Sequence, residues 1–144
     1  MIPARQIALV QDSFAQVLPI TAQAASFFYE RLFDLAPDTR LLFRGDMSSQ
    51  GRKLFQTLAL VVDGLDRIED VLPVAGALAV RHVGYGVHEE HYGAVGTALI
   101  DTLRHGLGHE FDDEVESAWT LAYGLLSGHM MLAARNAVRS EVAA

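Results

Sequence analysis

The chain has 144 residues, of which 51% are hydrophobic and 20% are charged, and its formal net charge is -7. This length and composition predict one globular domain over residues 1–144 and exclude a disordered chain. The acidic charge argues against binding to nucleic acid or to an anionic membrane surface, and the lack of cysteine excludes disulfides, thiolate metal sites and cysteine catalysis.

The first residues, MIPARQIALVQDSFAQ, lack the basic start and apolar run of a signal peptide. No stretch approaches the roughly 20 apolar residues that cross a bilayer, so we expect a cytoplasmic protein. Apolar residues at helical spacing over 7–17 predict a first helix, which Pro19 ends, and a second helix follows over 24–35. Pro37 suits the first turn of a short third helix that ends near Phe43.

Residues 45–49 (GDMSS) predict a loop in which a serine caps the next helix. Apolar residues over 54–65 lie on one face of that helix, and the Asp63-Gly64 pair marks its end. Asp66 with Glu69 resembles a capping box and predicts the start of another helix.

This next helix is expected to run to about His82, with a late start or a kink at Pro73. A further amphipathic helix is predicted over 92–103, and Asp113 with Glu116 predicts the start of a last long helix. The result is an all-α chain of about seven unequal helices. That pattern favours a layered helical fold over an up-down four-helix bundle, whose helices are fewer and more equal.

Histidine is the natural metal ligand in a chain without cysteine. The six candidates are His82, His88, His91, His105, His109 and His129. His88-Glu89-Glu90-His91 looks metal-like, but it lacks the spacing of the HExxH zinc motif, in which the histidines stand four apart. The segment falls where a helix is expected to begin, and we expect its charged side chains to be solvated.

His82 stands out through its relation to Gln50. From Gln50 to Gly64 is 14 steps, and from Arg67 to His82 is 15 steps. At 1.5 Å per residue both paths are about 21–22 Å long, so two antiparallel helices would place Gln50 and His82 at similar height on opposite walls. Leu54 follows Gln50 by one turn and shares its wall. A flat cofactor could fit between these walls with His82 as its ligand.

Six short motifs follow one another along the chain. They are FFYERLF (27–33), PDTRLLF (37–43), SSQGRKL (48–54), RHVGYGV (81–87), HYGAVG (91–96) and AWTLAYG (118–124). In this order they resemble bacterial single-domain globins and the haem domain of flavohaemoglobins. The likeness is greatest to neuroglobin-like bacterial globins, which share SSQxRKL and RHxxYGV. It spans nearly the whole chain and implies a three-over-three helical sandwich around haem b.

The resemblance also implies roles for individual residues. His82 is implied as the proximal ligand of the haem iron, since one axial histidine leaves the opposite position open for a gas. Tyr29 matches the tyrosine that points into the distal pocket, and Gln50 matches the distal glutamine. Leu54 matches the apolar residue beside that glutamine, and Phe43 matches the phenylalanine packed on the haem.

One position departs from the flavohaemoglobin pattern. There the proximal histidine is polarised by a tyrosine and a glutamate; Tyr92 matches the tyrosine, but the glutamate position falls at Ala134. A carboxylate beside the imidazole raises its basicity, so its loss weakens the case for a peroxidase or oxygenase. Arg81 could contact a haem propionate or could equally be an exposed arginine, and Tyr92 could simply pack beside His82.

Reversible and tight O2 binding is the function that the resemblance implies first, for oxygen storage, scavenging or delivery (oxygen transport), with CO and NO as further ligands. Nitric oxide dioxygenation, a route of nitric oxide detoxification, is the alternative, and it would need a separate reductase as partner because the chain shows no flavin or nicotinamide domain. A haem-based gas sensor is a third reading. The sequence leaves open whether the protein is a monomer or a homodimer.

Overall fold

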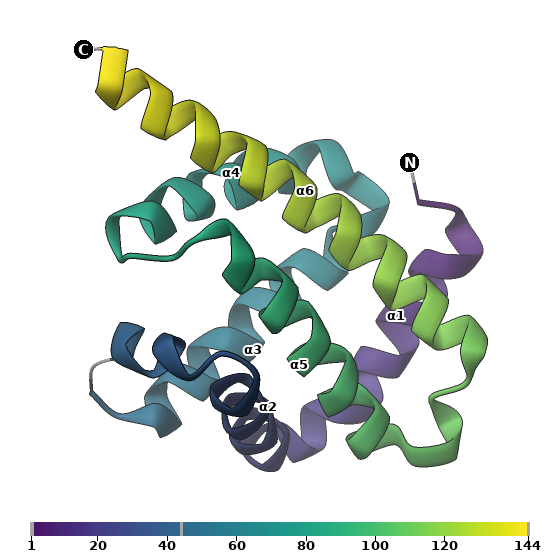
Figure 1. Ribbon diagram of the computed structural model, residues 1–144. Helices are drawn as coiled ribbons and strands as arrows, with labels where there is room; N and C mark the ends of the chain where they lie inside the picture. Colours follow the sequence, from purple (N-terminus) through teal and green to yellow (C-terminus); the bar gives the residue numbers. More distant parts are fainter. Residues whose placement is uncertain (1, 44, 144) are drawn as a thin grey trace.

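Helices make up nearly all of the computed structural model, which describes residues 2–43 and 45–143 (Figure 1). The α-helices are α1 (Ala4–Val17), α2 (Thr21–Leu35), α3 (Met47–Asp63), α4 (Ile68–Gly84), α5 (Glu89–Leu107) and α6 (Asp113–Ala143). Short 3₁₀-helices join them: η1 (Leu18–Ile20), η2 (Pro37–Leu42), η3 (Leu65–Arg67) and η4 (Gly108–Glu110). Over the described ranges the chain forms no strand, which confirms the predicted all-α class.

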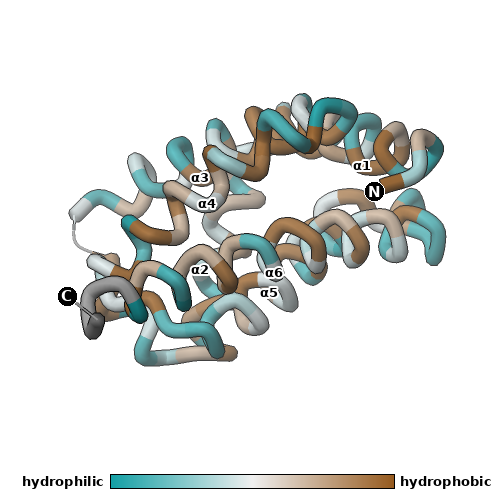
Figure 2. Tube along the Cα trace, turned by 90° about the horizontal axis from the view of Figure 1, so that it is seen from above, coloured by the Kyte–Doolittle hydropathy of each residue, from teal (hydrophilic) through white to brown (hydrophobic). Residues whose placement is uncertain are grey.

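The six α-helices form two layers. Figure 2 shows α1, α3 and α4 on one side, and α2, α5 and α6 on the other. Between the layers, α4 packs against α6, α3 against α2, and α1 against α6. This is the three-over-three helical sandwich that the sequence analysis expects. In the part of the chain that the structure describes, no helix has the length and apolar character that a membrane crossing demands.

The hydrophobic core is divided into two clusters of buried residues. The larger cluster joins α1, α2, α3, α5 and the first half of α6, and at its centre the Phe14 ring stacks on Phe55 and lies 6.2 Å from the Trp119 ring. The smaller cluster lies between α4, the start of α5 and the second half of α6. Its buried members are Ala75, Ala79, Tyr92, Met130 and Ala134. Residues of the candidate site described below belong to or pack on both clusters.

Helices α2 and α3 cross at an unusually short distance. A Cβ atom placed on Gly51 would lie 2.7 Å from the Cβ of Ala25, closer than two carbon atoms can approach. Only glycine therefore allows this crossing without a shift of the helices. The close approach brings Gln50, the neighbour of Gly51, next to α2.

Two helix starts differ by a residue or two from the prediction. The carboxylate of Asp46, and no serine, caps α3 by accepting the N–H of Ser48. At α6 the carboxylate of Asp112, one residue before the predicted Asp113, accepts the N–H of Val115. In both places an aspartate competes with its neighbours for the same free N–H groups, and a short carboxylate caps well from one position only.

The start of α4 also differs from the prediction. The 3₁₀-turn η3 precedes the helix, with the N–H of Arg67 bonded to the carbonyl of Gly64. This turn takes up Asp66, so the predicted capping box does not form and no side chain caps α4. The helix is already formed at Ile68, five residues before Pro73, and the predicted late start is wrong.

Candidate functional site

An aromatic group on α2 forms one wall of the site. Tyr29 is buried, and its ring meets the ring of Phe43 edge to face at a centroid distance of 5.1 Å. Phe33, one turn further along α2, completes the group at 5.8 Å from Phe43. Because η2 turns the chain back after α2, Phe43 reaches Tyr29 although 14 residues separate them. The structure thus brings together two residues that the sequence analysis assigns to one pocket.

Helix α3 supplies the other residues of this wall. The hydroxyl of Tyr29 donates a hydrogen bond to the backbone carbonyl oxygen of Gln50 over 3.3 Å. Leu54, one turn later, is half-buried and packs on the larger core cluster, as Phe43 does. Burial raises the pKa of Tyr29 to about 12, so its hydroxyl keeps its proton at neutral pH and remains a donor. The wall is therefore apolar apart from Tyr29 and Gln50.

His82 lies in the last turn of α4 and is half-buried. Burial, and secondly the charge of Arg81, lower the pKa of its imidazole, which is therefore neutral at neutral pH. Its Nδ1 atom is buried and has no hydrogen-bond partner among the described residues. A neutral imidazole in apolar surroundings is the form that binds iron. Arg81 beside it is exposed, and its contact with a propionate stays a prediction.

Tyr92 is buried in the smaller core cluster together with Ala134. Its hydroxyl is enclosed and finds no partner in the described part of the chain. Burial, and secondly the charge of Glu89, raise the pKa of Tyr92, so the group stays uncharged. The methyl group of Ala134 offers no carboxylate, and the nearby Glu89 is held by Arg135. This unpaired hydroxyl agrees with the prediction that the glutamate partner of the proximal tyrosine is missing.

The two walls together have the character of a haem site. Tyr29 belongs to the larger core cluster, on which Phe43 and Leu54 also pack. Leu78 and Val83, on either side of His82 along α4, pack on the smaller cluster. One wall thus offers a neutral imidazole, and the other offers one hydroxyl donor among apolar side chains. This set of groups fits a haem, whose faces are apolar and whose iron takes an imidazole nitrogen.

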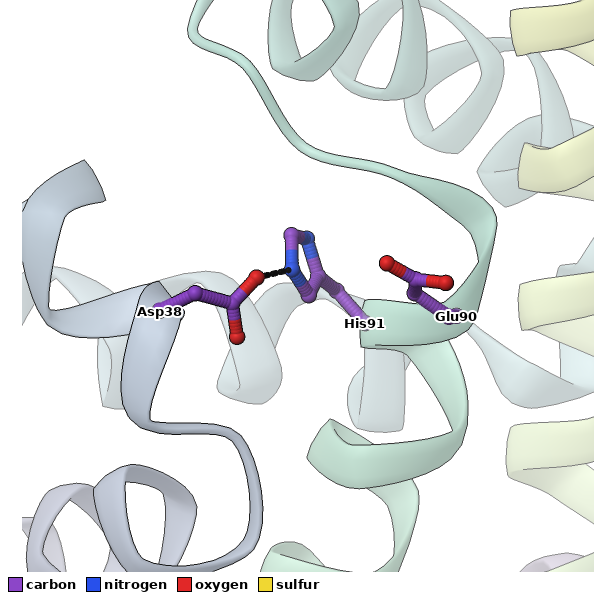
Figure 3. A group of neighbouring side chains, drawn as sticks. All are labelled: Asp38, Glu90 and His91. Atoms are coloured by element: carbon purple, nitrogen blue, oxygen red, sulfur yellow. Dashed lines mark hydrogen bonds and ion pairs between the residues drawn. The ribbon is translucent and has the colours of Figure 1, made fainter.

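One polar residue here escaped the sequence analysis. His91, at the start of α5, is only 4% exposed, so the expectation that the segment His88–His91 is solvated is wrong at this residue. Figure 3 shows its ring beside the carboxylate of Asp38, at 2.9 Å from Nε2 to Oδ2, with Glu90 on the other side. The sequence feature that could have indicated the burial of His91 is its place at the third residue of a helix, where a side chain can bond back to the N-cap N–H. The partner Asp38 stands 53 residues away and no local pattern indicates it.

Comparison with known proteins identifies the fold and its family. The model of the globin family matches residues 26–130. The chain belongs to the globin family. This globin is 36% identical over 103 residues to a flavohemoprotein of Bordetella parapertussis, an alignment that covers 69% of the chain and 26% of the relative. It is 37% identical over 106 residues to a flavohemoprotein of Chromobacterium violaceum, covering 71% of the chain and 26% of the relative.

The chain spans about a quarter of the length of these relatives. Among solved structures, it is similar to an engineered carbene transferase from Rhodothermus marinus that is described as a candidate nitric oxide dioxygenase. The two share a TM-score of 0.86 and 22% identity, and each chain is covered over 100% of its length, which supports the fold alone. Globins are haem-binding proteins, so these comparisons confirm the resemblance and a haem cofactor.

Proposed function

We propose that this globin binds haem b between the two walls and binds O2 reversibly, in the cytoplasm, for storage, scavenging or delivery. The observation that carries the proposal is the buried Tyr29 hydroxyl, a protonated donor bonded to the carbonyl of Gln50 in an otherwise apolar wall. A donor of this kind serves a ligand that carries negative charge. Among diatomic gases bound to ferrous iron, O2 has more of this character than CO.

Each residue of the site has a role in this proposal. When bound, haem would supply an iron that can take up a diatomic gas. His82 would hold the iron through its neutral imidazole, and the exposed Arg81 would pair with a propionate. Phe43 and Leu54 would cover the haem and exclude water. Tyr92, buried beside α4, would pack on the proximal side.

The distal donors decide how tightly the gas is held. Tyr29 and the side-chain amide of Gln50 would both donate hydrogen bonds to O2. A buried hydrogen bond to a partly charged acceptor contributes roughly 1.5–3 kcal/mol. That corresponds to about a 10–100-fold slower release of O2, and CO gains less from the same donors.

The visible absorption spectrum tests this proposal most directly. The purified protein is measured as isolated, after reduction, and after exposure of the reduced protein to air. We expect a haem band that changes on reduction and shifts again to a stable spectrum in air. A protein that takes up no haem even when haemin is added would overturn the proposal.

Nitric oxide dioxygenation is a second candidate, which the relatives favour. The relatives at 36–37% identity are flavohemoproteins of which the alignment covers 26%, so they contain parts that this chain does not match. For this second candidate, we propose a separate reductase as the source of electrons. We would measure consumption of NO in the presence of O2 and a flavin reductase, over many turnovers per protein molecule. A single turnover with every reductase offered would leave O2 binding as the function.

A further inference from the structure

His91 makes two hydrogen bonds from a buried position. Its Nδ1 atom accepts the backbone N–H of His88 at 2.9 Å, and its Nε2 lies 2.9 Å from a carboxylate oxygen of Asp38. Because Nδ1 accepts, the proton of the neutral ring must be on Nε2, which donates it to Asp38. One tautomer therefore satisfies both ring nitrogens. The bond from His91 in turn holds the pKa of Asp38 below its usual value.

The same tautomer argues against a metal ion at this place. Asp38, Glu90 and His91 bring ligand atoms within 4.8 Å of one another, as a cation site would require. A metal on Nε2 would displace the proton donated to Asp38, and Nδ1 would then have to carry a proton toward the N–H of His88. Two N–H groups cannot face each other in a hydrogen bond. The cluster is better explained as a hydrogen-bonded contact between η2 and α5.

This contact lies at the corner that joins α4 to α5. At this corner the N–H groups of Tyr85 and Val87 both donate to the backbone carbonyl of His82, at 3.1 and 3.0 Å. The next N–H along the chain, that of His88, is the one that the His91 ring accepts. Two consecutive N–H groups thus tie the corner to His82 on one side and to His91 on the other.

Helix η2 lies against the same corner. Gly86 has a φ of 95°, and a Cβ atom on it would lie 3.4 Å from the Leu42 side chain. The residue after Leu42 is Phe43, whose ring packs on Tyr29. The bond between Asp38 and His91 therefore connects the segment that carries Phe43 with the corner that holds the carbonyl of His82.

We propose that His91 is a positioning residue for His82. Through the N–H of His88 it fixes the α4–α5 corner, and the corner fixes the last turn of α4 from which the His82 imidazole projects. Through Asp38 it keeps this corner in a fixed position relative to the wall that carries Tyr29 and Phe43. The inference rests on the proposed function, because it concerns His82 as the ligand of the iron.

The test compares four variants with the wild type in the haem-loaded protein. His91→Leu removes both hydrogen bonds, and Asp38→Asn weakens one and keeps the other. His91→Gln is the conservative variant, because glutamine at this position of a helix can bond back to the N-cap N–H and still offer an amide to Asp38. Glu90→Gln is the matched control, an exposed neighbour in the same cluster.

Three readouts separate positioning from general stability. The iron–imidazole stretching band of the reduced protein reports on His82 itself. The rate of haem transfer to an acceptor globin reports on how firmly the protein retains haem, and urea unfolding reports on the stability of the fold. We expect His91→Leu to shift the band and to speed haem loss about tenfold, the effect of losing one hydrogen bond to a charged group. Asp38→Asn should shift the band less, His91→Gln should restore it, and Glu90→Gln should leave it unchanged.

The inference is overturned if His91→Leu loses stability while the band stays at the wild-type frequency. If His91→Leu does not fold, Asp38→Asn decides in the same way. Failure of the proposed function looks different, because the wild type itself would then show no iron–imidazole band, or His82→Ala would keep it.

Discussion

The hydroxyl of Tyr29 donates its one proton to the backbone carbonyl oxygen of Gln50 over 3.3 Å. This is longer than the usual 2.5–3.0 Å of an O–H···O bond, so the bond is weak. Burial keeps the proton in place, since it raises the pKa of Tyr29 to about 12. A hydroxyl that keeps its proton and holds a weak partner can turn toward a gas ligand at little cost.

Tyr29→Phe is therefore expected to speed the dissociation of O2. The ring and its edge-to-face contact with Phe43 remain in this variant, while the donor is lost. A buried hydrogen bond of roughly 1.5–3 kcal/mol corresponds to about a 10–100-fold faster rate. Stopped-flow mixing of the oxygen-loaded protein with dithionite and CO measures it.

Tyr85→Phe is the matched control for this prediction, because Tyr85 is 66% exposed. Its dissociation rate should equal that of the wild type. An unchanged rate in Tyr29→Phe would mean that the Tyr29 hydroxyl does not face the ligand.

His82→Ala is expected to abolish stable haem binding. The imidazole is neutral because burial lowers its pKa, and alanine offers the iron no ligand at this position. Titration of the variant with haemin, followed by absorption, should give no stable complex. His105→Ala serves as control, since His105 is exposed and stacks on Phe27 at 4.3 Å between ring centroids. A normal spectrum in His82→Ala would mean that another histidine holds the iron.

The sequence predicts the helices well because their signals are local. Apolar residues repeat every three to four positions, and the Asp63-Gly64 pair indicates the end of α3 correctly. The helix starts were harder, because adjacent side chains compete for the same N–H groups. At α3, Asp46 prevails over the serines, and at α4 the turn η3 removes Asp66 from the capping position.

The residues of the candidate site also differ in how far the sequence predicts them. The resemblance groups Tyr29, Phe43 and Gln50 in one pocket, and the structure does bring these three together. The bond between Asp38 and His91 could not be predicted, since it joins residues 53 apart whose meeting depends on how η2 lies against the α4–α5 corner. Here the tertiary packing carries the information, and the local sequence carries only the place of His91 near a helix start.

A pair of tyrosines allows a test of the smaller core cluster. The Tyr92 hydroxyl is buried without a partner among the described residues, whereas the Tyr123 hydroxyl donates to the backbone carbonyl of Tyr92 at 2.6 Å. Tyr92→Phe should leave the free energy of unfolding unchanged or raise it, because an unpaired buried polar group destabilises a protein. Tyr123→Phe should lower it by about 1 kcal/mol, the net contribution of one hydrogen bond.

Urea unfolding of the two variants measures this difference. Tyr92→Phe and Tyr123→Phe each remove one oxygen atom from a tyrosine, so each serves as the control of the other. If Tyr92→Phe is the less stable of the two, the Tyr92 hydroxyl has a partner in solution, and the proximal side contains an acceptor.

Alkaline pH provides a last prediction, again on Tyr29. Burial raises the pKa of this tyrosine from its ordinary 10.0 to about 12 in the folded protein, because burial disfavours the phenolate. Between these values the folded protein keeps a proton that the unfolded chain has lost, so the free energy of unfolding falls as the pH rises from 10 to 12. Tyr29→Phe has no such proton, and its stability should fall less steeply over this range. Some decline should remain in the variant, because burial also raises the pKa values of Tyr92 and Tyr123. Urea unfolding at several pH values compares the two slopes, and equal slopes would mean that the Tyr29 hydroxyl is as accessible in the folded protein as in the unfolded chain.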